Sequence, residues 1–208
     1  MFRKPEFITF TGIDDRTDLT TADALASEYP IEWGVLFATN SRDARFPSQQ
    51  AVSEILDIAG MKSAHLCGPC SREAQAGNVD KLPLEGFDRV QLNGFNVDQS
   101  HFHELEQRFG VQIIHQVRGE GFDPESVFMQ LFDCSGGKGI FPASIPALPG
   151  GGHMVGYAGG IGPETVHDYL NLIHGEGPFW IDMEGCVRTN GWFDLEKVRQ
   201  VCQLVYDN

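Results

Sequence analysis

The amino-acid sequence predicts an α/β fold, a (β/α)8 barrel that contains residues 1–208 as a single domain. Eight short runs of apolar, β-branched or aromatic residues recur along the chain, with amphipathic helical stretches between several of them. Strands that alternate with helices form parallel sheets. Eight such strands, followed by a final helix, favour a closed barrel over an open sheet. The 208 residues, 41% hydrophobic and 21% charged, suffice for one core and are near the lower limit for this fold.

The predicted strands carry the residues that favour extended structure, as in FITFTG and WGVLFA. Because a closed barrel brings its first and last strands together, we expect the first run to pair with the last. The eight runs span residues 7–12, 33–38, 63–68, 89–94, 111–117, 128–134, 156–160 and 179–184.

Three stretches show clear helical periodicity. Residues 48–59 open on a serine cap, residues 163–173 begin with a proline in the first turn, and residues 194–206 begin with Asp194. Residues 135–155 are rich in glycine and proline, so we expect the sixth helix to be lost or reduced to a turn. The fifth helix is expected to be short, with one or two turns around residues 124–128. Long loops of this kind in compact domains are usually functional or mobile.

The net charge of −14 argues against a nucleic-acid partner and against an anionic membrane surface. The N-terminus lacks the apolar stretch of a signal peptide, and no run approaches the ~18 apolar residues of a membrane span. The five cysteines show no disulfide framework. We therefore expect a cytoplasmic monomer or homodimer that binds a small molecule and needs no cofactor or metal.

The motif CGPC at residues 67–70 is the active-site dithiol of thioredoxin-like oxidoreductases. In those proteins the motif follows an early strand of a small domain and begins a long helix. Here it follows the third of eight strands, and the helical stretch after it is short. We expect Cys67 and Cys70 to form a strand-end turn without a redox role, with a metal site as the less favoured alternative.

The C-terminal ends of the strands form the active site in such barrels, so the polar residues there are candidates. They are Thr11, Asp14, Asp15, Asn40, Arg42, Arg45, Cys67, Gln91, Asn93, Gln116, Arg118, Asp133, Lys138, Gly159, Gly160, Asp182 and Glu184. His65 lies within a strand and is expected to be a hydrogen-bonded interior residue. Cys134 and Cys186 alternate with candidates and are expected to point away from the site.

The segment GYAGGIGPETV at residues 156–166 allows two interpretations. Glycines let backbone N–H groups converge on an anion, and a following helix adds a positive dipole. A tight turn that needs positive φ explains the same glycines. The segment alone favours neither.

Together with WIDMEGCVRTNGWFDLEKV, this segment resembles the C-terminal end of phosphoribosylanthranilate isomerases, which typically reads LAGGL-x-PENV followed by VDVSSGVE. VQLNG (90–94) resembles that family's VQLHG, LFDCSGGKG (131–139) its LLD…GGTGK, and GVLFATNSRDARFPS (34–48) its GFVF-x-x-x-SPR-x-VS. ITFTGIDD (8–15) resembles its opening VKICGIT. The likeness runs in order along nearly the whole chain and is strongest in the last quarter.

The resemblance implies an Amadori rearrangement, in which an aminoaldose phosphate opens and its carbonyl shifts. A cysteine base at the end of the first strand and an aspartate acid at the end of the sixth catalyse it. Asp133 falls on the aspartate, and Thr11 falls on the cysteine. The residues that the resemblance assigns to substrate or phosphate binding are Arg45, Gln91, Asn93, Gly159, Gly160, Asp182 and Gly185.

Thr11 is the most consequential departure, because a hydroxyl is too weak an acid to be ionised near pH 7 and to serve as the base. Glu184 and Gly185 replace the paired serines of the family, and a carboxylate 4 Å from a phosphate costs about 4 kcal/mol at an effective dielectric of 20. Either Glu184 has become the base, reaching across from the neighbouring strand, or the barrel has left this chemistry. In either case we favour a diverged enzyme over an orthodox isomerase.

Three functions are therefore open. The first is an isomerase or lyase for a small phosphorylated substrate, with Asp133 as acid and Glu184 or a cysteine as base. The second is a ligand-binding barrel without catalysis. The third is a metal-dependent lyase or hydrolase that uses carboxylates as oxygen ligands, namely Asp14, Asp133, Asp182 and Glu184.

Overall fold

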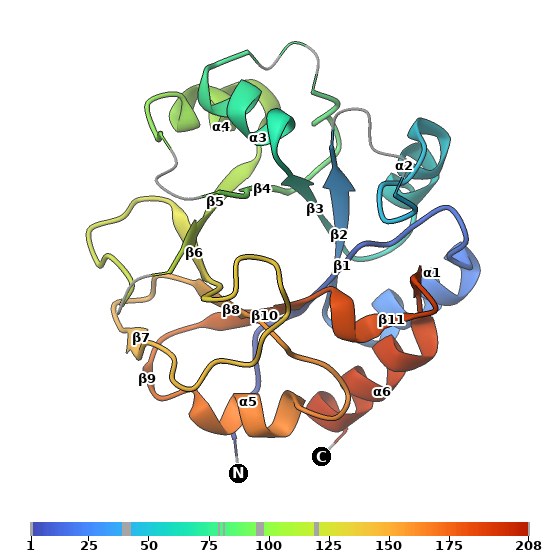
Figure 1. Cartoon of the computed structure of the whole chain (residues 1–208), viewed down its shortest axis with the longest axis vertical. Coiled ribbons are helices and arrows are strands. Elements are labelled where there is room, and N and C mark those ends of the chain that lie inside the picture. The colour runs from blue at the N-terminus through green and yellow to red at the C-terminus, as the bar shows by residue number, and fades with distance from the viewer. Residues whose placement is uncertain are drawn as a thin grey trace.

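Eight parallel strands close into a barrel in the computed structural model, which describes residues 2–38, 43–78, 80, 82–94, 98–118 and 121–207. Figure 1 looks onto the ring of strands, with helices around it. Around the ring, the strands are β1 (Ile8–Thr11), β2 (Ile31–Phe37), β3 (Met61–Leu66), β4 (Arg89–Leu92), β5 (Gln112–Val117), β6 (Met129–Phe132), β8 (Val155–Ala158) and β10 (Phe179–Met183). The predicted fold class is confirmed.

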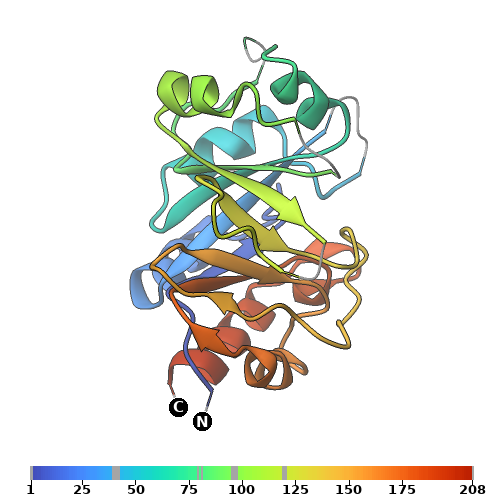
Figure 2. The same ribbon diagram turned by 90° about the vertical axis from the view of Figure 1, so that its left-hand side faces the viewer.

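Strand β1 closes the barrel, because it pairs with β2 on one side and with β10 on the other. The register sets Thr9 opposite Asp182 and Thr11 opposite Gly34. This is the pairing of first and last strands that the sequence predicts. The two chain ends also lie close together (Figures 1 and 2), where Lys4 donates a hydrogen bond to the Tyr206 carbonyl.

Six α-helices occur in the described part of the chain. They are α1 (Leu19–Glu28), α2 (Gln49–Leu56), α3 (Pro69–Gln75), α4 (Phe102–Phe109), α5 (Val166–Leu172) and α6 (Leu195–Tyr206). The side chains of Asp18, Ser48 and Asp194 cap α1, α2 and α6 by accepting backbone N–H groups of the first turn. Helices α2 and α6 begin within a residue of the predicted starts, whereas α5 begins three residues after Pro163.

Two connections of the barrel lack a helix among the described residues. Between β5 and β6, residues 121–128 form turns, so the short helix predicted around residues 124–128 is wrong. The side chain of Gln130 explains the absence of this helix. Its Oε1 accepts the backbone N–H of Asp123 and its Nε2 donates to the Asp123 carbonyl, so that an open turn is held in place. Between β6 and β8, only β7 (Leu148–Pro149) is regular, and it pairs with β9 (Gly175–Glu176). The predicted loss of the sixth helix is confirmed.

The connection between β10 and α6 contains structure that the sequence did not predict. A 3-10 turn, η1 (Gly185–Val187), leads into a small hairpin of β11 (Arg188–Thr189) and β12 (Trp192–Phe193). No helix in the described ranges has both the length and the apolar character needed to cross a membrane.

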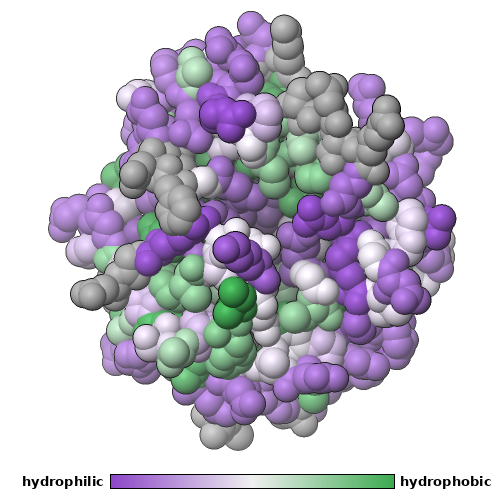
Figure 3. All heavy atoms as spheres, in the orientation of Figure 1, coloured by the Kyte–Doolittle hydropathy of each residue, from purple (hydrophilic) through white to green (hydrophobic). Residues whose placement is uncertain are grey.

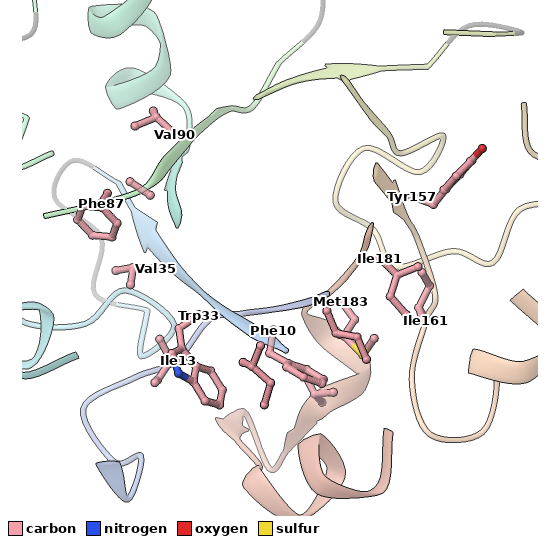
Figure 4. Packing of buried hydrophobic residues seen from close by; sticks show 14 of the residues in the cluster. Phe10, Ile13, Trp33, Val35, Phe87, Val90, Tyr157, Ile161, Ile181 and Met183 are labelled. Atoms are coloured by element: carbon pink, nitrogen blue, oxygen red, sulfur yellow. The ribbon is translucent and has the colours of Figure 1, made fainter. Parts of the chain in front are cut away.

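Apolar side chains fill two layers. The larger layer lies between the strands and the helices, where Phe10, Ile13 and Trp33 pack outside the ring (Figure 4). A smaller layer inside the barrel consists of Phe7, Ile114, Leu131, Ala158 and Trp180. Strand β1 illustrates the alternation, since Ile8 and Phe10 face the outer layer while Thr9 and Thr11 bind polar partners inside.

A buried ion pair crosses the barrel interior next to the apolar residues Phe7 and Trp180. Arg89 donates two hydrogen bonds of 2.5 Å to Glu32, and its guanidinium lies over the rings of Phe7 and Trp180. Burial raises the pKa of Glu32, but the charge and hydrogen bonds of Arg89, with the hydroxyl of Thr9, hold it below its usual range. The pair is therefore an ionised, structural element of the barrel.

Candidate active site

A cavity of about 220 Å3 opens at the C-terminal ends of the barrel strands. In Figure 1 the connection after β6 folds across this mouth, and Figure 3 shows polar residues gathered around the centre of the same face. All ten residues to which the sequence assigns catalysis or substrate binding line this cavity. They are Thr11, Arg45, Gln91, Asn93, Asp133, Gly159, Gly160, Asp182, Glu184 and Gly185.

Thr11 and Asp182 form a hydrogen-bonded pair at the seam of the barrel. The Thr11 hydroxyl donates to Asp182 Oδ1 over 2.7 Å, and both side chains are buried. Burial is the main cause that raises the pKa of Asp182, to about 7, while the Thr11 hydrogen bond opposes the rise. Asp182 is therefore a carboxyl group that exchanges its proton near neutral pH.

Asp133 directly follows β6 and is held by the loop after that strand. Its carboxylate accepts hydrogen bonds from Ser135 N at 3.0 Å, Ser135 Oγ at 2.8 Å and Gly137 N at 2.7 Å. These three donors fix the orientation of the carboxylate at the cavity wall. A catalytic group needs this kind of positioning by its neighbours.

Glu184 forms an ion pair with Arg45, whose Nη1 lies 2.9 Å from Glu184 Oε1. Arg45 also binds Asp43 through Nε at 2.9 Å. The negative charge of Glu184 beside the glycine turn is thus opposed by a guanidinium. The Cγ of Glu184 lies near Gly12 at the end of β1, as the predicted adjacency of these strands requires.

Arg188 lines the cavity although the sequence analysis did not single it out. Its guanidinium donates to the Gly12 carbonyl at 2.7 Å and to Asp14 Oδ2 at 2.9 Å, so it ties the loop after β1 to the hairpin after β10. Asp14 also accepts the Phe193 N–H. Asp14 is therefore a structural residue outside the cavity.

Two of the four carboxylates suggested as metal ligands are held by arginines. Asp14 is held by Arg188, and Glu184 by Arg45. Within the described ranges, no group of three or more His, Cys, Asp or Glu side chains is arranged to hold a metal ion. The oxygen-ligand set that the metal-dependent alternative needs is thus not formed.

Two side chains of β3 and β4 complete the wall of the cavity. His65 Nε2 lies 2.9 Å from Ser63 Oγ, and burial lowers the pKa of His65 to about 4, so the ring is neutral at pH 7. His65 is hydrogen-bonded inside the barrel, as predicted, yet it also lines the cavity. Gln91 donates to Asn93 Oδ1 at 2.8 Å.

The CGPC segment is divided between a turn and a helix. Cys67 and Gly68 form the strand-end turn that was predicted, whereas Pro69 and Cys70 are the first two residues of α3. Cys67 accepts a hydrogen bond from Asn93 Nδ2 at 3.3 Å, and burial raises the pKa of its thiol. An activated dithiol has the opposite property, a depressed pKa. Cys67 and Cys70 are both free thiols.

The glycine turn after β8 lies against the loop after β6. Gly159 and Gly160 have φ of +107° and +69°, and a Cβ at Gly160 would come within 2.6 Å of the Phe141 nitrogen. The Gly162 N–H is already bound by the Thr165 hydroxyl at 3.0 Å. The turn interpretation thus accounts for both glycines, and anion binding at this corner stays a prediction. Gly185, across the corner, has open space beside its Cα.

Three expectations remain for this face of the barrel. Asn40 and Arg42 lie outside the described residues. Cys134 is exposed. Cys186 lines the cavity, so the prediction that it points away is wrong. The reason is η1, which breaks the strand alternation directly after β10.

Comparisons with known proteins agree with this geometry. The family model of N-(5'-phosphoribosyl)anthranilate isomerase matches residues 71–204, more than half of the chain. The structure of N-(5'-phosphoribosyl)anthranilate isomerase from Pyrococcus furiosus superposes with a TM-score of 0.62 and 15% identity, covering 97% of this chain and 99% of that one. At this identity the superposition shows a shared fold. No curated protein matches the chain. The match of the family model over most of the barrel shows that the chain belongs to the N-(5'-phosphoribosyl)anthranilate isomerase family.

Proposed function

We propose that this protein catalyses an Amadori-type isomerisation of a phosphorylated aminoaldose, with N-(5'-phosphoribosyl)anthranilate as the first substrate to test. The observation that carries the proposal is the meeting of Asp133 and the Thr11–Asp182 pair at one cavity, where β8 lies between β6 and β10 in the ring. Membership of the isomerase family supports it. Acid–base isomerisation needs two such proton-transfer groups on one substrate.

In the proposed reaction Asp133 donates a proton to the ring oxygen of the sugar. The bond between carbon 1 and the ring oxygen breaks, and the nitrogen lone pair forms a C=N bond to carbon 1. Loss of a proton from carbon 2 then gives an enaminol. The enaminol then loses the proton of its hydroxyl group and gains a proton on carbon 1, which yields the ketone. The isomerisation needs no oxidant or reductant.

Cationic side chains at the mouth are available to an anionic substrate. The protein has a net charge of −14, and Arg45, Lys138 and Arg188 line the cavity beside Asp133, Asp182 and Glu184. An anion would bind Arg45 by replacing Glu184 on it. Arg72 and Arg118 line the adjoining cavity, which shares Leu36, Asn93, Gln116, Gly137 and Glu184 with the first. Local cations in a negative protein attract anions to one place. We assign the phosphate to the corner formed by Arg45, Gly160 and Gly185.

We further propose that the chain is a diverged member of its family, in which Thr11 takes the place of the cysteine base. The Thr11 hydroxyl is engaged as a donor to Asp182. This group holds a neighbour in place and has no means of taking a proton at neutral pH.

The test is conversion of N-(5'-phosphoribosyl)anthranilate by the purified protein, followed by chromatographic separation of substrate and product. Asp133→Asn should reduce kcat by at least about 10²-fold, because general acids typically contribute 10² to 10⁴. Asp168→Asn, on the exposed face of α5, is the matched control and should leave kcat unchanged. Binding of a phosphorylated sugar without conversion would instead identify a non-catalytic barrel.

A further inference from the structure

The proposed reaction needs a base for the proton on carbon 2, and Thr11 does not supply one. Its hydroxyl sits at the end of β1 and points to Asp182 Oδ1 at 2.7 Å. Gly34 faces Thr11 from β2, and a Cβ at that glycine would overlap the Thr11 hydroxyl, so the space between β1 and β2 is kept clear. Thr11 therefore has a fixed direction, toward the carboxyl group on β10.

Glu184 is a poor candidate for the base. Its carboxylate is bound by Arg45 at 2.9 Å, and its side chain is 26% exposed. Proton abstraction by Glu184 would convert a paired carboxylate into a neutral acid and leave Arg45 with Asp43 alone. Asp182 differs in both respects, because it is 6% exposed and its one hydrogen bond in the described structure comes from a neutral hydroxyl.

The charged groups around Asp182 come from several strands. Glu32 of β2, Glu184 after β10 and, once it has given up its proton, Asp133 after β6 act on Asp182 in the same direction, adding to burial in raising its pKa. Arg89 of β4 is engaged by Glu32, and Arg45 by Glu184. Arg188 is bound to Asp14, and His65 of β3 is neutral at pH 7. Lys138 lines the cavity from the loop after β6.

We infer that Asp182 is the catalytic base of this reaction and that Thr11 is its positioning residue. The inference rests on the proposed function. Asp182 takes the proton from carbon 2, the C–H electron pair becomes the bond between carbons 1 and 2, and the C=N pair returns to nitrogen. Asp182 then delivers its proton to carbon 1, and the hydroxyl proton of the enaminol goes to Asp133. Both aspartates end in the states in which they began.

The geometry explains how a family member works with threonine at the end of its first strand. Strands β1 and β10 are neighbours, so a carboxyl group on β10 reaches the same side of the substrate as a residue on β1. The base has moved one strand along the barrel. A general base works best when its pKa lies near the working pH, and the pKa of Asp182 is raised to about 7.

The pH dependence of kcat/KM tests both roles. The wild type should gain activity as the pH rises, with a midpoint near 7, because the base must be ionised. Thr11→Val removes the hydrogen bond that lowers the pKa of Asp182, so the midpoint should move up by about 0.5 to 1 pH unit. Thr11→Ser keeps a hydroxyl and should restore the wild-type midpoint. Asp182→Asn should lower kcat by at least about 10²-fold at every pH.

Three results would overturn the inference. A fold-intact Asp182→Asn enzyme within tenfold of wild type would remove Asp182 from catalysis while leaving the isomerase function in place. If the midpoint of the pH profile is the same in Thr11→Val as in the wild type, Thr11 does not position the base. The Thr11→Val measurement remains a test even if Asp182→Asn fails to fold. A wild type that converts no substrate would overturn the proposed function and this inference together.

Discussion

The Arg45 guanidinium lies 2.9 Å from the Glu184 carboxylate and joins the connection after β2 to the end of β10 across the barrel mouth. The pair is partly exposed, with 41% and 26% of the two side chains accessible. Such pairs contribute at most about 1 kcal/mol to stability. The contact therefore matters more for ligand binding than for folding, because an incoming phosphate competes with Glu184 for Arg45.

Replacing Glu184 by glutamine should tighten the binding of inorganic phosphate several-fold. The substitution removes a negative charge from the phosphate corner and releases Arg45 toward the ligand. Isothermal titration calorimetry measures the change, and urea unfolding should show a loss of no more than about 1 kcal/mol. Glu176→Gln, in β9 before the start of β10, is the matched control. Equal phosphate affinity in all three proteins would contradict the assigned corner.

Asp182→Asn should make the protein more stable at alkaline pH. The pKa of Asp182 is about 7 in the folded protein against 3.8 for an ordinary aspartate, so the folded protein holds a proton that the unfolded chain releases. The stabilisation of the folded protein by the proton on Asp182 is fully present below pH 3.8 and is lost as the pH rises through 7. At 1.36 kcal/mol per pH unit its upper limit is about 4 kcal/mol.

Urea unfolding at pH 5 and pH 8 measures this effect. The advantage of Asp182→Asn over wild type should be larger at pH 8 than at pH 5, and Asp168→Asn should show no such difference. A variant that is less stable than wild type at pH 8 would show that the ionised carboxylate is not the disfavoured form.

Gly160→Ala should lower the free energy of unfolding by about 1 to 3 kcal/mol. Its φ of +69° disfavours a side chain, and the added Cβ would lie 2.6 Å from the Phe141 nitrogen, which is backbone and cannot rotate away. Gly185→Ala, at the same corner but with open space around it, should cost less. Thermal unfolding compares the two, and an equal loss would mean that the loop after β6 does not rest on Gly160.

Replacing Cys67 and Cys70 together by serine should leave isomerase activity within a few-fold of wild type. Cys67 is a buried thiol whose pKa is raised, so it is not an activated nucleophile. The measurement is kcat/KM beside a circular dichroism spectrum. A folded double variant without activity would support a redox or structural role for the pair in the reaction.

The barrel was predictable because its strands are continuous apolar runs and its parallel topology follows from their alternation with helices. The observed helices differ from the predicted ones where side chains bind the backbone. Thr165 binds the Gly162 N–H and delays α5, and Gln130 holds Asp123 in an open turn where a helix was expected. These contacts depend on residues several positions apart taking one rotamer, which periodicity does not reveal.

The sequence predicted which residues line the cavity at one end of the barrel, because strand ends fix that position for any barrel. It did not reveal which side chains bind each other there. The hydrogen bond from Thr11 to Asp182 joins residues 171 positions apart, and Arg188 lies on a hairpin too short for a strand pattern. Burial, which raises the pKa of Asp182, is a property of the closed barrel and has no local sequence signal.

Closure of the barrel by β10 also orders events during synthesis. The ribosome completes β1 first and β10 last among the barrel strands, so the outer edge of β1 has no native partner until residues 179–183 emerge. An unpaired edge strand is a template for pairing with another chain. A truncated chain that ends before Phe179 lacks β10, so its sheet has two open edges. Such fragments should accumulate as aggregates or be degraded.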